Sequence, residues 1–175
     1  MSNKITIFGL AGTGKSSVGK TLAKSLYCAF VSTGNVFREQ AKEAGVAVHE
    51  YDKMAEADSI IDQKLDERIA QIGKIHENLV LESRLGWYFV PDSFKIKFIC
   101  DDEERFKRVA HRDGISEEES RSQSTIRENS HLDRFKKVYG ILDYSADEHF
   151  DLIIDTTNIH VSEIIDLILR KVEGE

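Results

Sequence analysis

Residues 5–26 read ITIFGLAGTGKSSVGKTLAKSL, and no other stretch constrains the architecture of the chain as tightly. A short apolar run from Ile5 to Phe8 ends at Gly9, and from Lys15 onward the apolar residues change to helical spacing. A glycine-rich segment separates the two patterns. The stretch therefore predicts a β-strand, a tight loop and an α-helix.

The segment from Gly9 to Ser16 fits the pattern G-x-x-x-x-G-K-[ST], with the required strand before it and helix after it. Glycines let a loop turn its backbone N–H groups inward around phosphates, and the following helix adds its positive end. In such a loop the lysine reaches the β and γ phosphates, and the next hydroxyl binds Mg²⁺. We therefore predict an ATP site; the alternative is a glycine-rich turn with an exposed lysine. The predicted ATP-binding residues are Gly9, Leu10, Ala11, Gly12, Thr13, Gly14, Lys15, Ser16 and Ser17.

Four further apolar runs follow, and each ends in polar residues. They cover residues 28–31, 79–81, 96–100 and 152–154, and helical patterns lie between them and after the last. Five strands alternating with helices predict an α/β P-loop NTPase fold, a parallel sheet with helices on both faces. Ligands collect beyond the carboxyl ends of such strands, where these polar residues fall.

Composition excludes several classes of protein. A chain of 175 residues has the length of one domain, and one Pro beside 11 Gly excludes collagen-like and proline-rich disordered chains. The formal charge of -7 disfavours nucleic acid as a partner. Two cysteines, Cys28 and Cys100, are too few for a disulfide framework, so we expect free, buried thiols. Without a signal peptide or a membrane-length apolar run, the sequence predicts a cytoplasmic location and no membrane partner.

An acidic residue and two arginines are further candidates for binding the metal and the phosphates. Glu82 ends the run at 79–81, where P-loop proteins place a carboxylate that helps to hold the metal, here through water. Its alternative role is a solvated strand-end carboxylate. Arg127 and Arg134 are seven residues apart, so on a helix they share one face and could grip phosphates together. A solvated face with ion pairs is the alternative.

The region from Ser116 to Lys137 is very polar, with few apolar residues. We therefore expect a helix that packs lightly on the body and can move. The six histidines lack metal-ligand spacing, which favours surface or satisfied core positions and predicts no zinc site. The aromatic residues from Trp87 to Phe89 could stack on a base, but packing is the more common use of such a cluster.

The chain resembles the cytidylate kinases, in particular the short archaeal-type branch of the nucleoside monophosphate kinases. Three segments beyond the P-loop carry the resemblance. Residues 32–38 are similar to the family's S-[ST]-G-x-x-F-R segment, and residues 79–84 to its strand followed by an acid, Gly and Arg. Residues 127–141 look like the lid signature R-E-x-x-x-x-x-R…Y-G-I. A turn at 90–92 and a strand at 151–156 also match.

The resemblance implies one domain over residues 1–175, with substrate-binding helices at 34–73 and a lid at 101–140. It implies a monomer that transfers the γ-phosphate of Mg·ATP to CMP or dCMP, with Lys15, Arg127 and Arg134 as catalytic residues. The implied substrate-binding residues are Ser32, Thr33, Gly34, Arg38 and Arg84, and the implied metal-binding residues are Ser16 and Glu82.

The chain also departs from the family pattern. Ser83 stands where the family has Gly, and Leu132 and Asp133 stand where relatives often carry arginines. These departures bear on base preference and rate. Two other hypotheses therefore stay open: a P-loop kinase of another small metabolite, of the shikimate, gluconate or dephospho-coenzyme A type, and a nucleotide-binding switch module without turnover.

Overall fold

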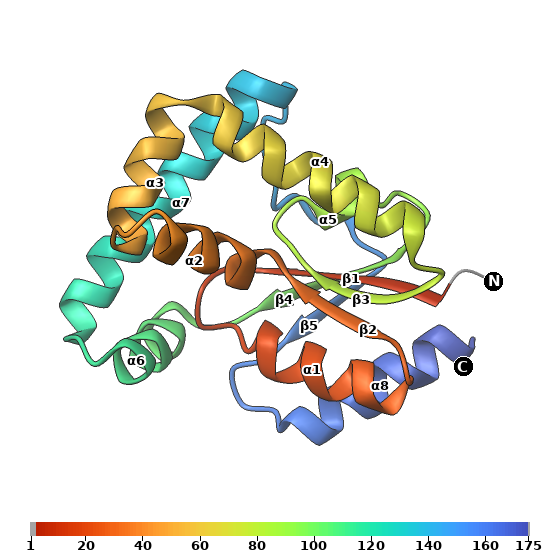
Figure 1. Cartoon of the computed structure of the whole chain (residues 1–175). Helices are drawn as coiled ribbons and strands as arrows, with labels where there is room; N and C mark the ends of the chain where they lie inside the picture. The colour runs from red at the N-terminus through yellow and green to blue at the C-terminus, as the bar shows by residue number, and fades with distance from the viewer. Residues whose placement is uncertain (1–2, 175) are drawn as a thin grey trace.

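The computed structural model describes residues 3–174, and it contains the predicted five-stranded parallel sheet with helices on both faces (Figure 1). The strands are β1 (Asn3–Gly9), β2 (Ala29–Ser32), β3 (Asn78–Glu82), β4 (Phe94–Ile99) and β5 (Leu152–Asp155). The helices are α1 (Lys15–Ser25), α2 (Thr33–Glu43), α3 (Val48–Ala57), α4 (Ser59–Ile75), α5 (Gly86–Phe89), α6 (Asp102–Asp113), α7 (Glu117–Tyr139) and α8 (Val161–Glu173), with a 3-10 turn at Asp147–His149.

The strand order β2-β3-β1-β4-β5 places β1 at the centre of the sheet. All neighbouring strands run parallel, so their carboxyl ends lie at one edge. The register sets Glu82 beside both Ile7 of β1 and Ser32 of β2. The loop after β1, the start of α2 and the carboxylate at the end of β3 are therefore neighbours.

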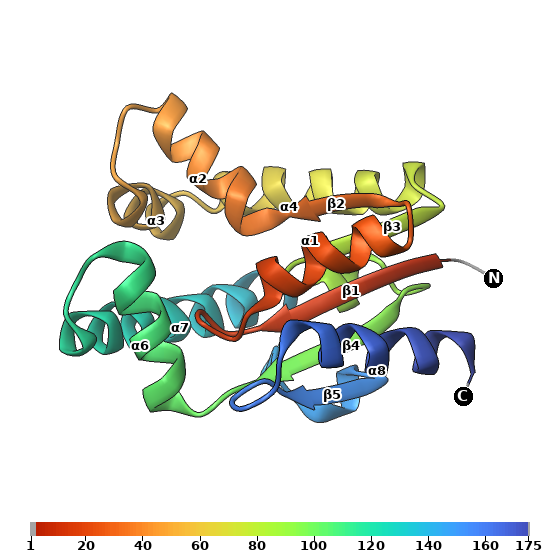
Figure 2. The ribbon, with the colours of Figure 1, turned by 90° about the horizontal axis from the view of Figure 1, so that it is seen from below.

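The alternation of side chains along the strands gives the sheet two buried faces. Ile5, Ile7 and Val80 point to the face that α1 and α8 cover, where they pack with Leu22 and Ile168. Figures 1 and 2 show these two helices side by side on that face. A sheet covered on both sides needs apolar residues at successive positions, which explains the continuous apolar runs of the sequence.

Two smaller clusters cover the opposite face. Leu79 and Leu81 pack against Ile69 of α4 and Val90 after α5. Phe8 packs against Leu85, Phe135, Ile141 and Tyr144, so the end of α7 is anchored on the sheet. The prediction that this polar helix packs only lightly is therefore wrong for its carboxyl-terminal part, where Phe135 is buried.

Helices α6 and α7 pack on each other and extend past the carboxyl ends of the strands (Figure 2). Asp101 caps α6 by accepting the backbone N–H groups of Glu103 and Glu104, and Ser116 caps α7 by accepting that of Glu119. Buried Arg105 joins the two helices through a bidentate contact with Glu128, at 2.8 and 3.3 Å.

We expect Glu128→Ala to lower the free energy of unfolding by about 2–3 kcal/mol, because it leaves the buried Arg105 guanidinium with one partner, Asp102. Urea unfolding followed by circular dichroism measures this change. The matched variant Asp102→Ala removes the exposed partner and should cost less than about 1 kcal/mol. Equal effects of the two variants would contradict the role given to Glu128.

The two cysteines are free, as predicted, but they are partly exposed rather than buried. The reason is their position: Cys28 immediately precedes β2 and Cys100 immediately follows β4, so each lies outside the covered part of its strand. None of the described helices is long and apolar enough to cross a membrane.

Candidate active site

The loop between β1 and α1 adopts the conformation that its glycines permit. Gly12 and Gly14 have φ angles of 86° and 83°, a region that residues with a Cβ rarely adopt. A Cβ on Gly12 would also lie 2.2 Å from the carbonyl oxygen of Arg105. Lys15 Nζ donates to the carbonyl oxygen of Leu10 at 2.7 Å, so the lysine lies along the loop. The loop and the start of α1 together form a concave anion site.

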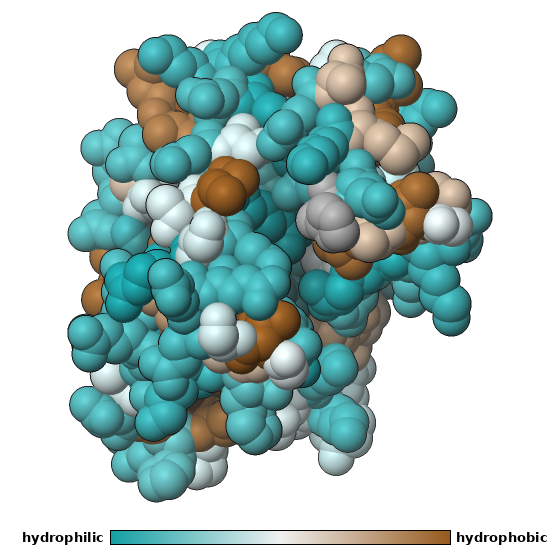
Figure 3. All heavy atoms as spheres, turned by 90° about the vertical axis from the view of Figure 1, so that its left-hand side faces the viewer, coloured by the Kyte–Doolittle hydropathy of each residue, from teal (hydrophilic) through white to brown (hydrophobic). Residues whose placement is uncertain are grey.

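This loop forms one wall of a cavity of about 480 Å³ at the carboxyl ends of the strands. Figure 3 shows the corresponding face of the molecule as largely hydrophilic and hollowed near its centre. Helices α2, α4, α6 and α7 and the residues after β3 supply the other walls. The basic lining residues are Lys15, Arg38, Arg84, Arg108, Arg112, Arg127 and Arg134, and the acidic ones are Asp62, Asp66 and Glu82. The cavity is therefore basic in a chain that is acidic overall.

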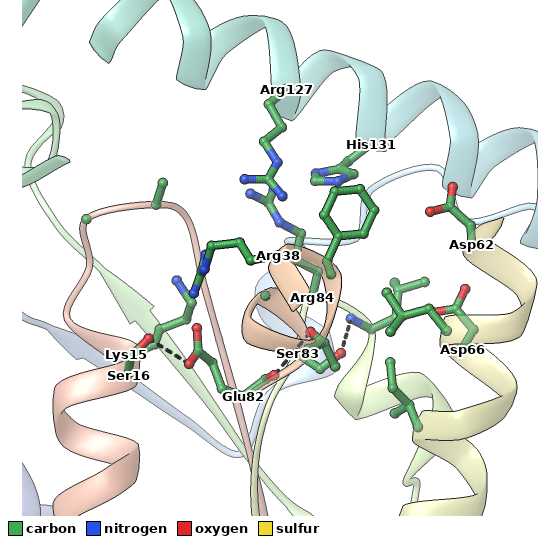
Figure 4. A pocket seen from close by; sticks show the side chains of 18 of the residues that line it. Lys15, Ser16, Arg38, Asp62, Asp66, Glu82, Ser83, Arg84, Arg127 and His131 are labelled. Atoms are coloured by element: carbon green, nitrogen blue, oxygen red, sulfur yellow. Dashed lines mark hydrogen bonds between the residues drawn. The ribbon is translucent and has the colours of Figure 1, made fainter. Parts of the chain in front are cut away.

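Ser16 and Glu82 form the pair predicted for a metal. The Ser16 hydroxyl donates to Glu82 Oε2 at 2.7 Å, and the carboxylate is buried at the end of β3 (Figure 4). Thr33 Oγ1 donates to the backbone carbonyl of Glu82 and fixes this strand end further. A hydroxyl and a carboxylate oxygen are hard ligands that suit Mg²⁺, so the donor set fits this ion.

The charge of Lys15 is only partly compensated. Burial lowers the pKa of Lys15 to about 8, because the ammonium is removed from water; Arg84 and Arg112 lower it further, and Glu82 opposes them. A bound anion would favour the charged form of the lysine. The site is therefore electrostatically suited to a phosphate.

Three arginines face Lys15 across the cavity. Arg38 comes from α2, Arg84 from the segment after β3 and Arg127 from α7, and Figure 4 shows their guanidinium groups converging. Burial, and then the charge of Arg84, lower the pKa of Arg127 to about 10. Its only ion-pair partner among residues 3–174 is Asp52, 3.5 Å from Arg127 Nε. These cations repel one another, so an anion between them would relieve the repulsion.

Arg134 lines the same cavity but is already engaged. It lies 3.1 Å from Asp62 and 3.4 Å from Asp52, and both carboxylates are buried. The seven-residue spacing thus places Arg127 and Arg134 on one face, as predicted. Their surroundings differ, however: Arg127 points into the cavity, whereas Arg134 joins α7 to α3 and α4.

The structure divides the predicted site residues into lining and supporting groups. Ala11, Gly12, Gly14 to Ser17, Thr33 and Gly34 line the cavity. Gly9, Leu10 and Thr13 belong to the same segment but do not line the cavity, and the Thr13 hydroxyl donates to the Leu10 carbonyl. Ser32 caps α2 by accepting the backbone N–H of Asn35 and lies outside the lining. Its predicted role in substrate binding has no direct contact to support it.

Five ionisable residues of the lining were not predicted as site residues from the sequence. Arg108 and Arg112 are one turn apart on α6, and Arg108 donates to the carbonyls of Gly12 and Thr157. Asp62 and Asp66 line the end of the cavity farthest from Lys15, and His131 lines it next to Arg127 (Figure 4). Arg108 and Arg112 show i,i+4 spacing in the sequence, and so do Asp62 and Asp66. No comparable pattern marks His131, and the prediction of a surface or satisfied core histidine is wrong for it, because its buried Nδ1 has no partner among the described residues.

The aromatic residues of α5 pack against other side chains and lie outside the cavity lining. Trp87 stacks on His149 with ring centroids 3.8 Å apart, and its indole N–H donates to the Tyr144 carbonyl. Ser83 lines the cavity, and its hydroxyl accepts the backbone N–H of Leu85. Within the part of the chain that the structure describes, no cluster of three or more His, Cys, Asp or Glu side chains could hold a metal.

Comparison with known proteins identifies the family. The model of the cytidylate kinase-like family matches residues 4–158. The chain belongs to the cytidylate kinase-like family. One family relative, a cytidylate kinase from Sulfolobus acidocaldarius, is 40% identical over 170 residues, covering 95% of this chain and 92% of that protein. The family predicted from the motifs is therefore confirmed.

Two further similarities extend the comparison. An S-adenosylmethionine-dependent nucleotide dehydratase from Lacinutrix mariniflava is 36% identical over 171 residues, or 97% of this chain; the chain spans only 36% of the length of that protein. A shikimate kinase structure from Bacteroides thetaiotaomicron superimposes with a TM-score of 0.66 at 13% identity, over 97% of this chain and 98% of that one. The second likeness confirms the P-loop kinase fold for this member of the cytidylate kinase-like family.

Proposed function

We propose that this protein transfers the γ-phosphoryl group of Mg·ATP to a pyrimidine nucleoside monophosphate, CMP or dCMP, giving ADP and the diphosphate. One observation carries the proposal: Lys15 in the phosphate loop faces Arg38, Arg84 and Arg127 across a single cavity. A triphosphate on the loop and a monophosphate on the arginines would place donor and acceptor end to end. Membership of the cytidylate kinase-like family and a relative named cytidylate kinase support the choice of CMP.

The residues act through position and charge. Lys15 holds the terminal phosphates, and Arg127 neutralises charge on the group in transfer while Arg38 and Arg84 hold the acceptor phosphate. No general base is required, because a phosphate monoester with a second pKa of about 6 is already a dianion at neutral pH. The nucleophile is thus supplied by the substrate.

Ser16 would hold Mg²⁺ directly and Glu82 would hold it through water. When bound, the ion neutralises the β and γ oxygens of the donor. The hydrogen bond between the two side chains orients them before the metal arrives. Helices α6 and α7 would close over the nucleotides and limit hydrolysis of ATP by water.

We expect Glu82→Gln to raise the Mg²⁺ concentration needed for half-maximal rate by about 10- to 100-fold, because the amide cannot supply the charge that orients metal-bound water. Titration of MgCl₂ at fixed ATP measures the shift. The matched variant Glu77→Gln, just before β3, should leave the titration unchanged. An identical magnesium requirement in Glu82→Gln and the unsubstituted protein would remove Glu82 from the metal site.

A panel of phosphoryl acceptors tests the proposed function. Coupled detection of ADP is run with Mg·ATP and CMP, dCMP, UMP, AMP, shikimate or gluconate, and we expect the highest kcat/KM with CMP or dCMP. Turnover confined to a non-nucleotide acceptor would favour the metabolite-kinase hypothesis. Tight ATP binding without turnover of any acceptor would favour a switch module. A cytoplasmic location and a monomeric state stay predictions from the sequence.

A further inference from the structure

The end of the cavity farthest from the phosphate loop contains two buried carboxylates. Asp62 and Asp66 lie four residues apart on α4, so they project from one face of the helix. Their side chains lie opposite Lys15, with the arginines between (Figure 4). Leu65 and Ile69 of the same helix supply apolar surface around them. A phosphorylated ligand anchored at the arginines would therefore present its other end to these two carboxylates.

Each carboxylate has one oxygen engaged by the protein. Tyr139 donates its hydroxyl to Asp66 Oδ2, and Arg134 Nε lies 3.1 Å from Asp62 Oδ2. Arg134 is shared with Asp52, so its charge does not belong to Asp62 alone. The Oδ1 atoms of Asp62 and Asp66 are left to accept from a ligand. A buried carboxylate group accepts several hydrogen bonds, and Tyr139 and Arg134 occupy one oxygen of each, which leaves room for donors from a ligand.

The electrostatics of the two carboxylates also favour donors from a ligand. Burial raises the pKa of Asp66 to about 7; its hydrogen bond from Tyr139 opposes the effect, and the nearby Asp62 adds to it. Burial likewise raises the pKa of Asp62, against the attraction of Arg134. A ligand that brings N–H donors would stabilise the charged form of both side chains.

A second residue of the same cavity also lacks a partner. His131 is only 6% exposed and lines the cavity, and its Nδ1 makes no hydrogen bond within residues 3–174. Burial and the charges of Arg84, Arg127 and Arg134 keep the pKa of His131 well below its ordinary value, so the ring is neutral at pH 7. A buried, unpaired ring nitrogen in the same cavity as the two carboxylates indicates that a polar ligand completes the site.

We propose that Asp62 and Asp66 together read the acceptor base by accepting the two N–H bonds of one exocyclic amine, the 4-amino group of cytosine. This inference rests on the proposed function, which supplies the pyrimidine monophosphate. An amine with two hydrogens satisfies both Oδ1 atoms at once, and cytosine presents such a donor. Uracil has a carbonyl oxygen at the same position, which brings no donor to the two carboxylates and is accommodated only when one of them, such as Asp66, takes up a proton. Asp62 and Asp66 are therefore specificity-determining residues that select CMP over UMP.

The experiment compares acceptors and variants in the full chain. Rates with CMP, UMP and the monophosphate of pyrimidin-2-one riboside, which has hydrogen in place of the amine, are measured for the unsubstituted protein. The same rates are measured for Asp62→Asn, Asp66→Asn and the control Glu67→Gln, an exposed neighbour on α4 outside the cavity. An asparagine keeps the shape of the aspartate but can donate to the uracil carbonyl.

We expect the unsubstituted protein to prefer CMP over UMP and over the pyrimidin-2-one nucleotide by at least about 100-fold in kcat/KM, because a buried acceptor left unpaired discriminates strongly. Each asparagine variant should lower the CMP:UMP ratio by at least about 10-fold, while Glu67→Gln leaves it unchanged. Equal use of CMP and the pyrimidin-2-one nucleotide, or a ratio unchanged in both asparagine variants, overturns the proposal.

Two further measurements keep the outcome decisive. If the variants fail to fold, the pyrimidin-2-one comparison in the unsubstituted protein decides. If no monophosphate is phosphorylated, the proposed function fails, and calorimetric binding of CMP and UMP to the unsubstituted protein decides the base-reading proposal separately. Equal affinities would overturn it, and a preference of at least about 100-fold for CMP would support it.

Discussion

Substitution of Lys15 by Ala should lower kcat by about 10³-fold or more, with little change in stability. Lys15 is the first residue of α1, and its ammonium donates to the Leu10 carbonyl of the phosphate loop at 2.7 Å. This ammonium is therefore the cation that the loop itself provides. Its removal leaves charge on the transferring phosphoryl group uncompensated at the point where the loop binds it. Steady-state ADP formation with saturating Mg·ATP and CMP measures the loss.

A matched control comes from the same helix. Lys20 is an exposed lysine of α1 outside the cavity, so Lys20→Ala should keep kcat within about twofold. Thermal unfolding of both variants separates loss of chemistry from loss of fold. A Lys15→Ala protein that retains the full rate would refute both the ATP site and the kinase assignment.

The second large effect concerns the arginines of α7, which we expect to separate into two roles. Arg127→Ala should lower kcat by about 10²- to 10³-fold, because this guanidinium points into the cavity and is repelled by Arg84 and Arg38 until an anion arrives. Rapid-mix single-turnover kinetics measure the phosphoryl-transfer step directly.

Arg134→Ala should behave differently, because the Arg134 guanidinium forms ion pairs with Asp52 and Asp62. Its removal leaves the buried Asp62 without its ion-pair partner and Asp52 with Arg127 alone, so we expect the free energy of unfolding to fall by about 2–4 kcal/mol and KM for the acceptor to rise, with kcat less affected. Denaturant unfolding and a KM-against-kcat comparison measure the two effects. Equal losses of kcat in the two variants, with stability unchanged, would show that both arginines act on the transferring group.

The contrast between the two arginines shows how far sequence reasoning reached. The strand, loop and helix at residues 5–26 follow from local patterns: a continuous apolar run, glycine conformation and helical spacing act over a few residues. The five strands and the pairing of Ser16 with Glu82 were therefore predictable, since parallel strands bring their carboxyl ends to one edge.

The acceptor end was not predictable in the same way. Asp62 and Asp66 sit in a polar helical stretch, and their i,i+4 spacing does not distinguish them, because the exposed Asp58 shares it. Only the tertiary structure turns them inward, where Tyr139 and Arg134 of α7 contact them. The burial of Phe135, which anchors α7, likewise depends on Phe8 and Tyr144, which are distant in sequence from one another.

The position of Asp52 has a consequence for the affinity of the site. This carboxylate of α3 lies 3.5 Å from Nε of Arg127, the α7 guanidinium that points into the cavity. A phosphate that binds Arg127 competes with this ion pair. The measured affinity for that phosphate is therefore a net value, lower than the contacts of the bound state alone would give.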